Sequence, residues 1–298
     1  MMTEAEIESS FSEINCWSSG DTRAPNKPLL LITALAAVQN GDRWIAFNEF
    51  EQRFRQILLD FGPQRDSQHP EYAFWRLQKD GIWSIPVADK ISEDLTSKGD
   101  AKVTTLRKLN AKAGFSDQIY DQLRNSPHLV LRCAQTLLEN AFPESLHSAI
   151  LQAIGLSTEE VGLRKRDTRF RKQILRIYER RCAICSYDGQ LGQSVLGLEA
   201  AHIKWHAAGG PDLPANGIAL CSFHHTALDR GALGFDDTLR ILVSQDVTGG
   251  NSVNDLLLRW SGCSLREPLL GTESPAVEFV RWHRREVFHH PARSFPSE

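Results

Sequence analysis

Apolar residues recur at helical spacing through most of the first half of the chain. In the second half, helical spacing and strand-like alternation both occur. An apolar run predicts a helix from Leu29 to Gln39. Asn26-Lys27-Pro28 opens it and Asn40-Gly41 ends it, because proline fits the first helical turn and glycine the residue after the last one. Asn48, followed by Glu51, is close to a capping box and predicts a second helix that runs to Asp60. Further helices are predicted over residues 103–113, 117–125, 129–140 and 144–154.

Strand patterns interrupt this helical half. Trp44–Phe47 is predicted to be a short strand, and a polar loop covers residues 64–70. Residues 72–78 and 82–86 are two runs rich in aromatic and apolar side chains on either side of Lys79-Asp80-Gly81, which predicts a β-hairpin with an Asp-Gly turn. At hairpin spacing, Phe74 and Trp83 are expected in the core. Two helices, a basic loop and an aromatic hairpin are similar to a winged-helix layout, which can read DNA.

The second half predicts a strand, a loop, a second strand and a helix. An amphipathic helix over 170–180 comes first, a strand over 194–200 ends at His202, and residues 218–220 lead into a helix over 223–229 that Gly231 stops. The stretch 155–162 is the expected domain boundary. The fold class is therefore α+β, with a DNA-reading domain at 1–155, a basic linker at 156–172 and a second domain at 173–298.

Composition favours a globular protein of two domains, since 41% of the 298 residues are hydrophobic and 24% are charged. The N-terminus predicts no signal peptide, no apolar run is long enough to span a membrane, and the cysteine pattern indicates metal binding in a reducing compartment, so we expect a cytoplasmic protein. The net charge of −3 conceals a basic segment from Leu163 to Arg181. Phosphates are its expected partners, with Arg164, Lys165 and Arg166 as candidate contacts.

Four residues have the spacing of a metal site. Cys182-Ala-Ile-Cys185 and Cys221-Ser-Phe-His224 are two short knuckles, from which proteins build one tetrahedral structural Zn²⁺ site. Three thiolates and one imidazole fill all four positions. Because a closed site has no room for an activated water, this zinc is expected to stabilise the fold and to take no part in catalysis.

Residues 182–231 resemble the HNH (ββα-metal) endonuclease family, on the runs Ala-Ala-His202-Ile, Asn216-Gly and Cys-Ser-Phe-His-His225. The resemblance implies phosphodiester hydrolysis with His202 as general base, Asn216 orienting the base or its loop, and His225 binding a catalytic Mg²⁺ or Mn²⁺. Many such sites carry a metal-binding acidic residue just before the base. Here that position is Ala201, which leaves open whether Glu199, Asp229, or only phosphate and water complete the metal shell.

The first half resembles the sulfur-binding domain of bacterial enzymes that cut phosphorothioated DNA, on Arg23-Ala-Pro-Asn-Lys-Pro, His69-Pro-Glu-Tyr-Ala-Phe-Trp-Arg and Asp80-Gly-Ile-Trp. Sulfur on a phosphate needs a small apolar cup rimmed by cations. Candidate cations are Arg23, Lys27, Arg65 and Arg76, and candidate walls are Pro25, Tyr72, Ala73 and Trp75. For Tyr72 and Trp75, the core is an equally good location.

Together the two resemblances imply a type IV-like restriction endonuclease that docks on phosphorothioated double-stranded DNA and cuts nearby. Two alternatives remain: an HNH nuclease that reads methylated or hydroxymethylated cytosine, and a zinc-braced DNA-binding module with little hydrolysis. The sequence context of the mark, the cut distance, the stereoisomer and the oligomeric state, including a homodimer, stay open.

Overall fold

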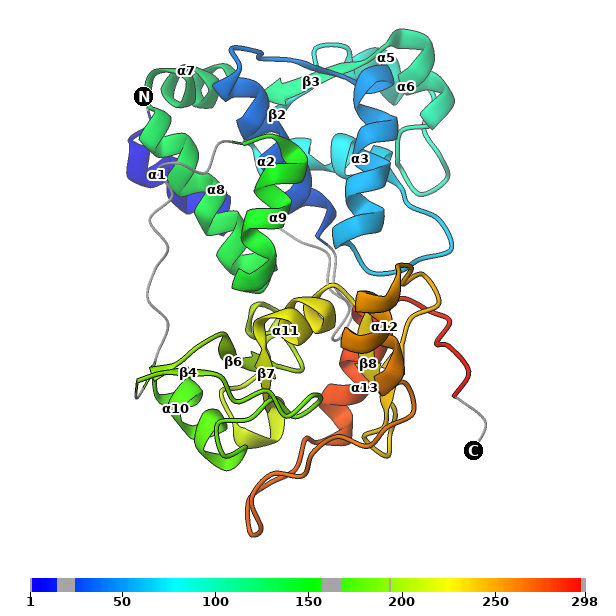
Figure 1. Cartoon of the computed structure of the whole chain (residues 1–298). Coiled ribbons are helices and arrows are strands. Elements are labelled where there is room, and N and C mark those ends of the chain that lie inside the picture. The colour runs from blue at the N-terminus through cyan, green and yellow to red at the C-terminus, as the bar shows by residue number, and fades with distance from the viewer. Residues whose placement is uncertain (1, 15–24, 157–167, 193, 296–298) are drawn as a thin grey trace. The chain divides into compact units, whose positions relative to one another are not determined.

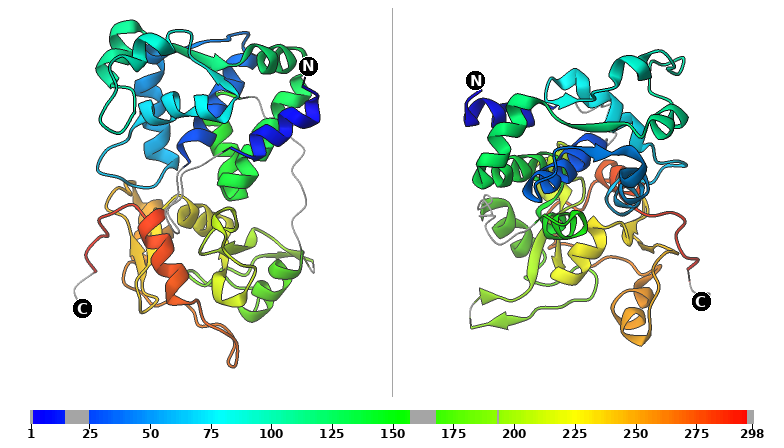
Figure 2. Two further views of the ribbon diagram at one scale, coloured as in Figure 1. Left: turned by 180° about the vertical axis from the view of Figure 1, so that it is seen from behind. Right: turned by 90° about the horizontal axis from the view of Figure 1, so that it is seen from above.

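The computed structural model describes residues 2–14, 25–156, 168–192 and 194–295. The chain divides into two compact units, Met1–Gly162 and Leu163–Glu298. Figures 1 and 2 draw helices through most of the first unit and a mixture of short strands and helices in the second. Among the described residues, no helix combines the length and the apolar character that crossing a membrane requires.

The first unit is built around an apolar central helix, α2 (Asn26–Gln39), which is buried along most of its length. Helix α2 packs against five helices, of which Figure 1 labels all but α4: α3 (Phe47–Phe61), α4 (Pro70–Arg76), α7 (Asp117–Asn125), α8 (Pro127–Ala141) and α9 (Glu144–Ile154). The remaining helical elements of this unit are α1 (Glu4–Ser12), η1 (Leu77–Asp80), α5 (Ala88–Ser92) and α6 (Val103–Leu109).

Several predicted helices are confirmed, and their ends have the expected causes. Asn40 caps α2, and Gly41 follows with a φ of 87°, a backbone conformation that glycine adopts without steric cost. The capping box at Asn48 is wrong, because α3 starts one residue earlier at Phe47 and Asn48 lies within it. The helix predicted over 103–113 ends at Leu109, since Asn110 turns left-handed with a φ of 39°.

The hairpin predicted over 72–86 is wrong. Residues 70–80 form α4 and η1, because Pro70 suits a first helical turn and Ala73, Phe74 and Leu77 then share one buried helical face. Strand β2 (Trp83–Ser84) instead pairs with β3 (Lys112–Phe115), which also pairs with β1 (Ile45–Ala46). All three strands are antiparallel in the order β1-β3-β2. Phe74 and Trp83 do lie in the core, as expected.

In the second unit, the predicted strand, loop, strand and helix are confirmed. Strand β6 (Leu198–His202) pairs antiparallel with β7 (Gly217–Cys221), and α11 (Ser222–Asp229) follows directly. Helix α10 (Thr168–Ile177) packs against both strands. The short strands β4 (Gln190–Leu191) and β5 (Ser194–Val195) pair with each other. The expected linker of 156–172 falls partly outside the described residues, and its last part is the start of α10.

In the remainder of the second unit, β8 (Leu233–Phe235) packs against α11. Strands β8 and β9 (Ile241–Val243) pair antiparallel, and α13 (Val277–Glu286) packs on β8. Single-turn helices η2 (His206–Ala208) and η3 (Pro214–Asn216) lie in the loop between β6 and β7, and α12 (Asn251–Leu256) and η4 (Leu258–Trp260) follow β9. A continuous apolar core joins α10, β6, β7, α11, β8 and β9.

Candidate functional site

The two knuckles meet at one point in the second unit. Cys182, Cys185, Cys221 and His224 place one ligand atom each within 4.8 Å of one another. The Sγ atoms of Cys185 and Cys221 are 4.0 Å apart, close to the value of about 3.8 Å that tetrahedral Zn–S bonds imply. His224 Nδ1 lies 3.2 Å from Cys221 Sγ and 3.5 Å from Cys182 Sγ. This cluster could hold one metal ion.

The surroundings of the cluster suit a metal ligand set. His224 Nε2 donates a hydrogen bond of 2.7 Å to the carbonyl of Leu256, which leaves Nδ1 as the nitrogen that faces the thiols. Hydrogen bonds among the three thiols lower the pKa of Cys182 and raise that of Cys221, so the cluster favours a thiolate at Cys182, the form that binds metal. Cys221 ends β7 and His224 lies in the first turns of α11, so the knuckle joins a strand to a helix.

His202 lies at the end of β6, as predicted, and two groups fix its ring. Its Nε2 is 2.7 Å from Oδ1 of Asp212, and the ring of Phe170 stacks on it at a centroid distance of 4.1 Å and an angle of 8°. A carboxylate on one nitrogen stabilises a protonated imidazole and fixes which nitrogen is available as a base. Asp212 was missed as a site residue, although an acid near a candidate base histidine was a usable signal.

Asn216 holds a loop and has no hydrogen bond to the histidine among those described. Its side chain is fully buried and makes three hydrogen bonds to backbone atoms. Oδ1 accepts from Lys204 N at 2.8 Å, and Nδ2 donates to the carbonyls of Lys204 at 2.9 Å and Pro211 at 3.0 Å. These bonds close the loop that follows His202 and carries Asp212. Of the two roles expected for Asn216, the geometry favours orientation of the loop.

His225 lies one residue after His224 on α11, with a carboxylate at each ring nitrogen. Nδ1 is 2.5 Å from Glu199 Oε2, and Nε2 is 3.1 Å from Asp229 Oδ2. Burial disfavours the charged ring, but Asp229 and Glu199 outweigh it and raise the pKa of His225 to about 9. The same contact lowers the pKa of Glu199 to about 2. Both acids that the sequence left open therefore contact His225, and Ala201 is buried.

In the first unit, all the described sulfur-binding candidates except Pro25 line one hollow of ≈1020 Å³, here called the N-terminal hollow. Its lining combines basic, aromatic and small side chains. Among the lining residues are Lys27, Arg65, His69, Tyr72, Ala73, Trp75, Arg76, Lys98 and Asp100. Trp75 is largely buried and its Nε1 donates to the carbonyl of Gly99 at 3.1 Å, so it belongs to the core as much as to the hollow. Tyr72 is half-buried.

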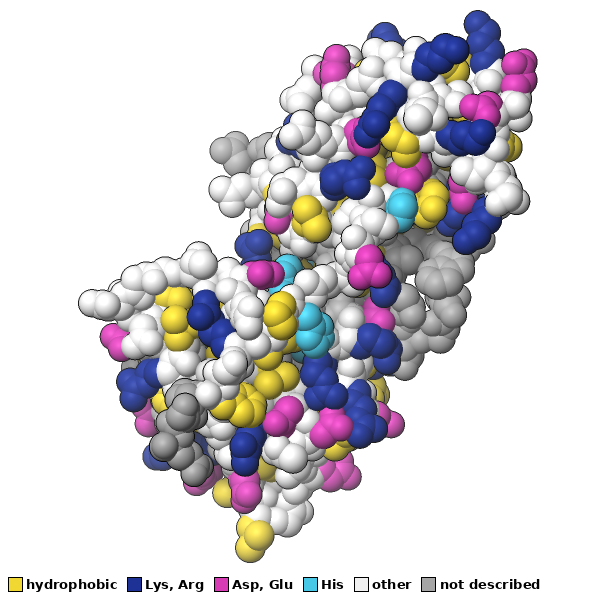
Figure 3. All heavy atoms as spheres, turned by 90° about the vertical axis from the view of Figure 1, so that its right-hand side faces the viewer, with side chains coloured by type: hydrophobic (Ala, Val, Ile, Leu, Met, Phe, Trp, Pro, Cys, Tyr) yellow, Lys and Arg dark blue, Asp and Glu magenta, His cyan; other side chains and the backbone are white. Residues whose placement is uncertain are grey.

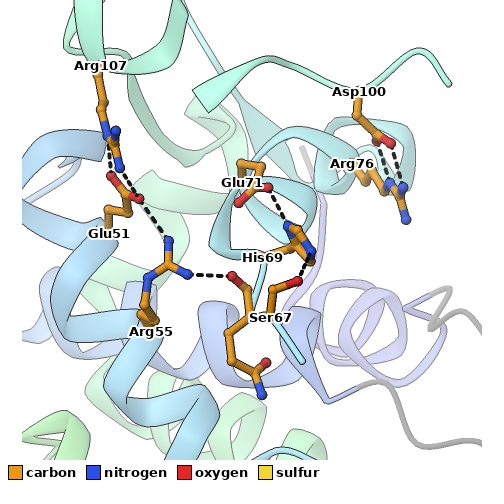
Figure 4. Close-up of polar contacts among 9 residues, drawn as sticks. Glu51, Arg55, Ser67, His69, Glu71, Arg76, Asp100 and Arg107 are labelled. Carbon is orange, nitrogen blue, oxygen red and sulfur yellow. Dashed lines mark hydrogen bonds and ion pairs between the residues drawn. The ribbon is translucent and has the colours of Figure 1, made fainter. Parts of the chain in front are cut away.

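Two cations in the N-terminal hollow are held by acids. Arg76 forms a bidentate pair with Asp100, with both N–O distances 2.6 Å, and its guanidinium lies 4.5 Å from the centre of the Tyr72 ring (Figure 4 shows the pair). Hydrogen bonding from Arg76 lowers the pKa of Asp100 despite burial. Lys27 Nζ lies 2.6 Å from Asp80 Oδ2. The acids fix the positions of these cations.

A chain of polar contacts fixes one wall of the hollow. His69 Nδ1 lies 2.8 Å from Glu71 Oε1 and Nε2 lies 2.7 Å from Ser67 Oγ, while its ring stacks on Tyr72 at 4.6 Å (Figure 4). His69 stands in the quoted run but was missed as a site residue. Arg55 supports the same loop, donating to the carbonyl of Gln68 at 2.7 Å.

Glu51 holds Arg55 in place. It accepts two hydrogen bonds from Arg107, at 2.7 and 2.8 Å, and one from Arg55 at 3.0 Å (Figure 4). The predicted capping role of Glu51 is thus replaced by an ion-pair network between α3 and α6. The network ties the loop to two helices.

Arg23, Arg164, Lys165 and Arg166 lie outside the described residues. On the face drawn in Figure 3, Lys and Arg side chains alternate with Asp and Glu and form no single continuous patch in the part of the chain that is described. The basic segment predicted over 163–181 therefore remains a prediction as a DNA contact.

Comparison with known protein families identifies the family of the first unit. Residues 4–159 match the model of the ScoMcrA-like, DNA sulfur-binding domain family. The chain belongs to this family. Residues 182–236 match the HNH endonuclease family. The protein is therefore a sulfur-binding-domain protein with an HNH nuclease domain, and HNH nucleases depend on metal ions.

Solved structures with similar chains include the sulfur-binding domain of ScoMcrA complexed with phosphorothioated DNA, at 21% identity and a TM-score of 0.44, covering 50% of this chain and 94% of that one. The type IV phosphorothioation-dependent restriction endonuclease ScoMcrA is also similar, at 21% identity and a TM-score of 0.43, covering 50% of this chain and 28% of that one. The modification-dependent TagI restriction endonuclease is similar at 22% identity and a TM-score of 0.29, covering 45% of this chain and 41% of that one. Among curated proteins, none matches.

Proposed function

We propose that this protein is a modification-dependent restriction endonuclease that binds phosphorothioated double-stranded DNA and hydrolyses phosphodiester bonds nearby. The observation that carries the proposal is the union, in one chain, of a DNA sulfur-binding domain and an HNH endonuclease domain. A nuclease domain alone would cut DNA without regard to modification. A domain in the same chain that binds modified phosphate would direct the nuclease domain to modified DNA.

The N-terminal hollow supplies the chemistry that a phosphorothioate requires. Replacing a phosphate oxygen by sulfur keeps the negative charge but makes one side larger, softer and less hydrated. Ala73 and the ring of Tyr72 offer apolar surface to sulfur, while Lys27, Arg65 and Arg76 offer positive charge to the phosphate. Because Arg76 is already held by Asp100 and lies over Tyr72, little side-chain entropy is lost when DNA binds.

The cluster of Cys182, Cys185, Cys221 and His224 is proposed to hold a structural Zn²⁺. The donor set of three sulfurs and one nitrogen, the spacing of the ligands and the hydrogen bond of His224 to Leu256 all support zinc. Such a site holds β7 and α11 together and so fixes the residue that follows, His225. The zinc would therefore position the catalytic residues without touching substrate.

Hydrolysis is assigned to His202, supported by Asp212 and Asn216. His202 accepts a proton from water as the water attacks phosphorus, and Asp212, 2.7 Å from its Nε2, stabilises the resulting imidazolium. Phe170 fixes the plane of the ring, and Asn216 keeps the loop that carries Asp212 closed. His225 would hold a divalent ion, Mg²⁺ or Mn²⁺, which when bound stabilises charge on the phosphate and on the leaving oxygen.

The decisive experiment compares cleavage of four duplexes of one sequence: plain, phosphorothioated, methylated at cytosine and hydroxymethylated at cytosine. The phosphorothioated duplex is supplied as separated stereoisomers, with Mg²⁺ or Mn²⁺. We expect cleavage of one phosphorothioated stereoisomer only, and none with His202→Ala. Cleavage of a cytosine-modified duplex instead would favour the first alternative function. Tight binding with no metal-dependent cutting of any duplex would favour the binding module.

A second measurement tests the N-terminal hollow. Tyr72→Ala should erode the preference for phosphorothioated over plain duplex, which we expect to be on the order of 1–3 kcal/mol from burial of a small apolar group. Removal of the Arg76 charge should lower affinity for both duplexes. Since Arg76→Ala would leave the buried Asp100 unpaired, the variant to use is Arg76→Gln with Asp100→Asn, with Lys90→Ala as the control cation outside the hollow. Equal losses for Tyr72→Ala on both duplexes would contradict this assignment.

A further inference from the structure

The two carboxylates at His225 cannot both share one metal ion with it. Glu199 faces Nδ1 and Asp229 faces Nε2, and these nitrogens lie on opposite edges of the ring. An imidazole binds a metal through one nitrogen, while the other carries a proton that needs an acceptor. If His225 binds the ion, at most one of the two acids can share it, and the other accepts the N–H bond.

Burial distinguishes the two roles. The side chain of Asp229 is 1% exposed, whereas that of Glu199 is 43% exposed. Mg²⁺ and Mn²⁺ prefer six ligands and, in nuclease sites, keep several positions for water and substrate phosphate. Because Glu199 reaches solvent, water and substrate phosphate can approach the ion from the side of Nδ1. At Nε2, the buried Asp229 of the same helix has the geometry of an orienting acceptor.

Strand geometry places Glu199 on the same face of β6 as Ala201, whose side chain cannot bind a metal ion. Successive residues of a strand point to opposite faces, so Glu199 and Ala201 share one face of β6 and His202 points to the other. The contacts agree, because His225 and Ser222 of α11 meet Glu199, while Phe170 of α10 meets His202. Ser222 Oγ donates to Glu199 Oε1 at 2.7 Å.

We infer that Glu199 is a direct ligand of the catalytic divalent cation, bound at Nδ1 of His225, and that Asp229 is the positioning residue at Nε2. The inference rests on the proposed nuclease function and names the ligand set of its metal. Neighbouring ligands of a six-coordinate ion lie about 3 Å apart, so Glu199 Oε2 and His225 Nδ1 need to separate by only about half an ångström from their 2.5 Å contact.

The test measures Mn²⁺ binding to the whole, zinc-loaded chain by electron paramagnetic resonance, without DNA. Four variants are compared with the wild type: Glu199→Gln, Asp229→Asn, His225→Ala and the exposed control Glu273→Gln. Zinc content and near-ultraviolet circular dichroism confirm that each variant is folded. Nitrogen coupling to the bound Mn²⁺ reports the histidine ligand directly.

We expect Glu199→Gln to weaken Mn²⁺ binding by at least about tenfold and His225→Ala to remove the nitrogen coupling. Asp229→Asn should cost less than Glu199→Gln, because the asparagine oxygen still accepts the Nε2–H bond. Glu273→Gln should match the wild type. Mn²⁺ affinity within about twofold of wild type in Glu199→Gln, or a larger loss in Asp229→Asn, would overturn the assignment.

The same measurements separate this assignment from the proposed function. Unchanged Mn²⁺ affinity in Glu199→Gln, in a protein whose wild type cuts phosphorothioated DNA, overturns the ligand assignment alone. A wild type that binds Mn²⁺ through Glu199 but leaves phosphorothioated duplex uncut supports the ligand assignment and overturns the proposed function.

Discussion

Replacing Asn216 by alanine should loosen the loop between β6 and β7 rather than remove a catalytic group. The change deletes three hydrogen bonds of 2.8, 2.9 and 3.0 Å to the backbone of Lys204 and Pro211. At a net value of roughly 1 kcal/mol each, their loss should destabilise the second unit by about 3 kcal/mol, since the backbone groups left behind are shielded from water. The loop carries Asp212, so cleavage should fall as well.

The assay follows denaturant unfolding of the second unit by zinc release, and backbone hydrogen exchange over residues 204–216. Asn216→Ala should lower the free energy of unfolding and speed exchange of the Lys204 amide, while exchange in the first unit stays unchanged. Asn254→Ala is the matched control, because Asn254 is exposed on α12 and its replacement should change stability by only a few tenths of a kcal/mol. Wild-type stability and Lys204 exchange in Asn216→Ala, with activity lost, would show that Asn216 acts in chemistry and not on the loop.

Three further outcomes are expected. Purified protein should carry one tightly bound zinc per chain, and Cys185→Ser should unfold the second unit, because metal binding contributes folding free energy; zinc-free but fully folded wild type would contradict this. His202→Ala should abolish cutting while DNA affinity and zinc content stay at wild-type levels, as filter binding and metal analysis can check, and full activity of this variant with Mn²⁺ would point to another base. Arg76 lowers the pKa of Asp100 in the folded state below its ordinary value of 3.8, so the pairing stabilises the first unit fully above that pH, and this stabilisation is lost as pH falls through the lowered pKa. Acid unfolding curves of wild type and Asp100→Asn should therefore begin to converge below about pH 4, and parallel curves would refute the pairing.

Sequence patterns predicted the elements whose causes are local. Helix α2 carries its own end signals in Pro28 and Gly41, and the knuckle spacing of Cys182 and Cys221 already implied a shared site. The hairpin predicted from Tyr72 to Pro86 was wrong because aromatic residues fit a strand and a buried helical face equally well. Its pairing partner, β3, lies beyond two intervening helices, so local alternation contained no information about it.

Site residues that depend on long-range contacts were the hardest to predict. Asp100 meets Arg76 across 24 positions, and Glu199 meets His225 across 26. No local pattern indicates such partners, because they meet only in the folded chain; Glu199 and His225, for example, are brought together by the pairing of β6 with β7 and the packing of α11. The sequence could name Glu199 and Asp229 as candidates for the metal shell, but only geometry assigns each of them to its own ring nitrogen.

The stacking of Phe170 on His202 limits how far the nuclease half can be shortened from its N-terminal side. Helix α10 begins at Thr168, and Arg171, one turn in, donates to the carbonyl of Leu198 at 2.9 Å, at the start of the strand that ends in His202. Both ends of β6 are thus held by the first turn of α10. A fragment that starts at the first zinc ligand, Cys182, would keep every metal-binding side chain and every residue of the HNH match, yet it would lose the ring that fixes the base. The smallest autonomous nuclease should therefore begin no later than Thr168.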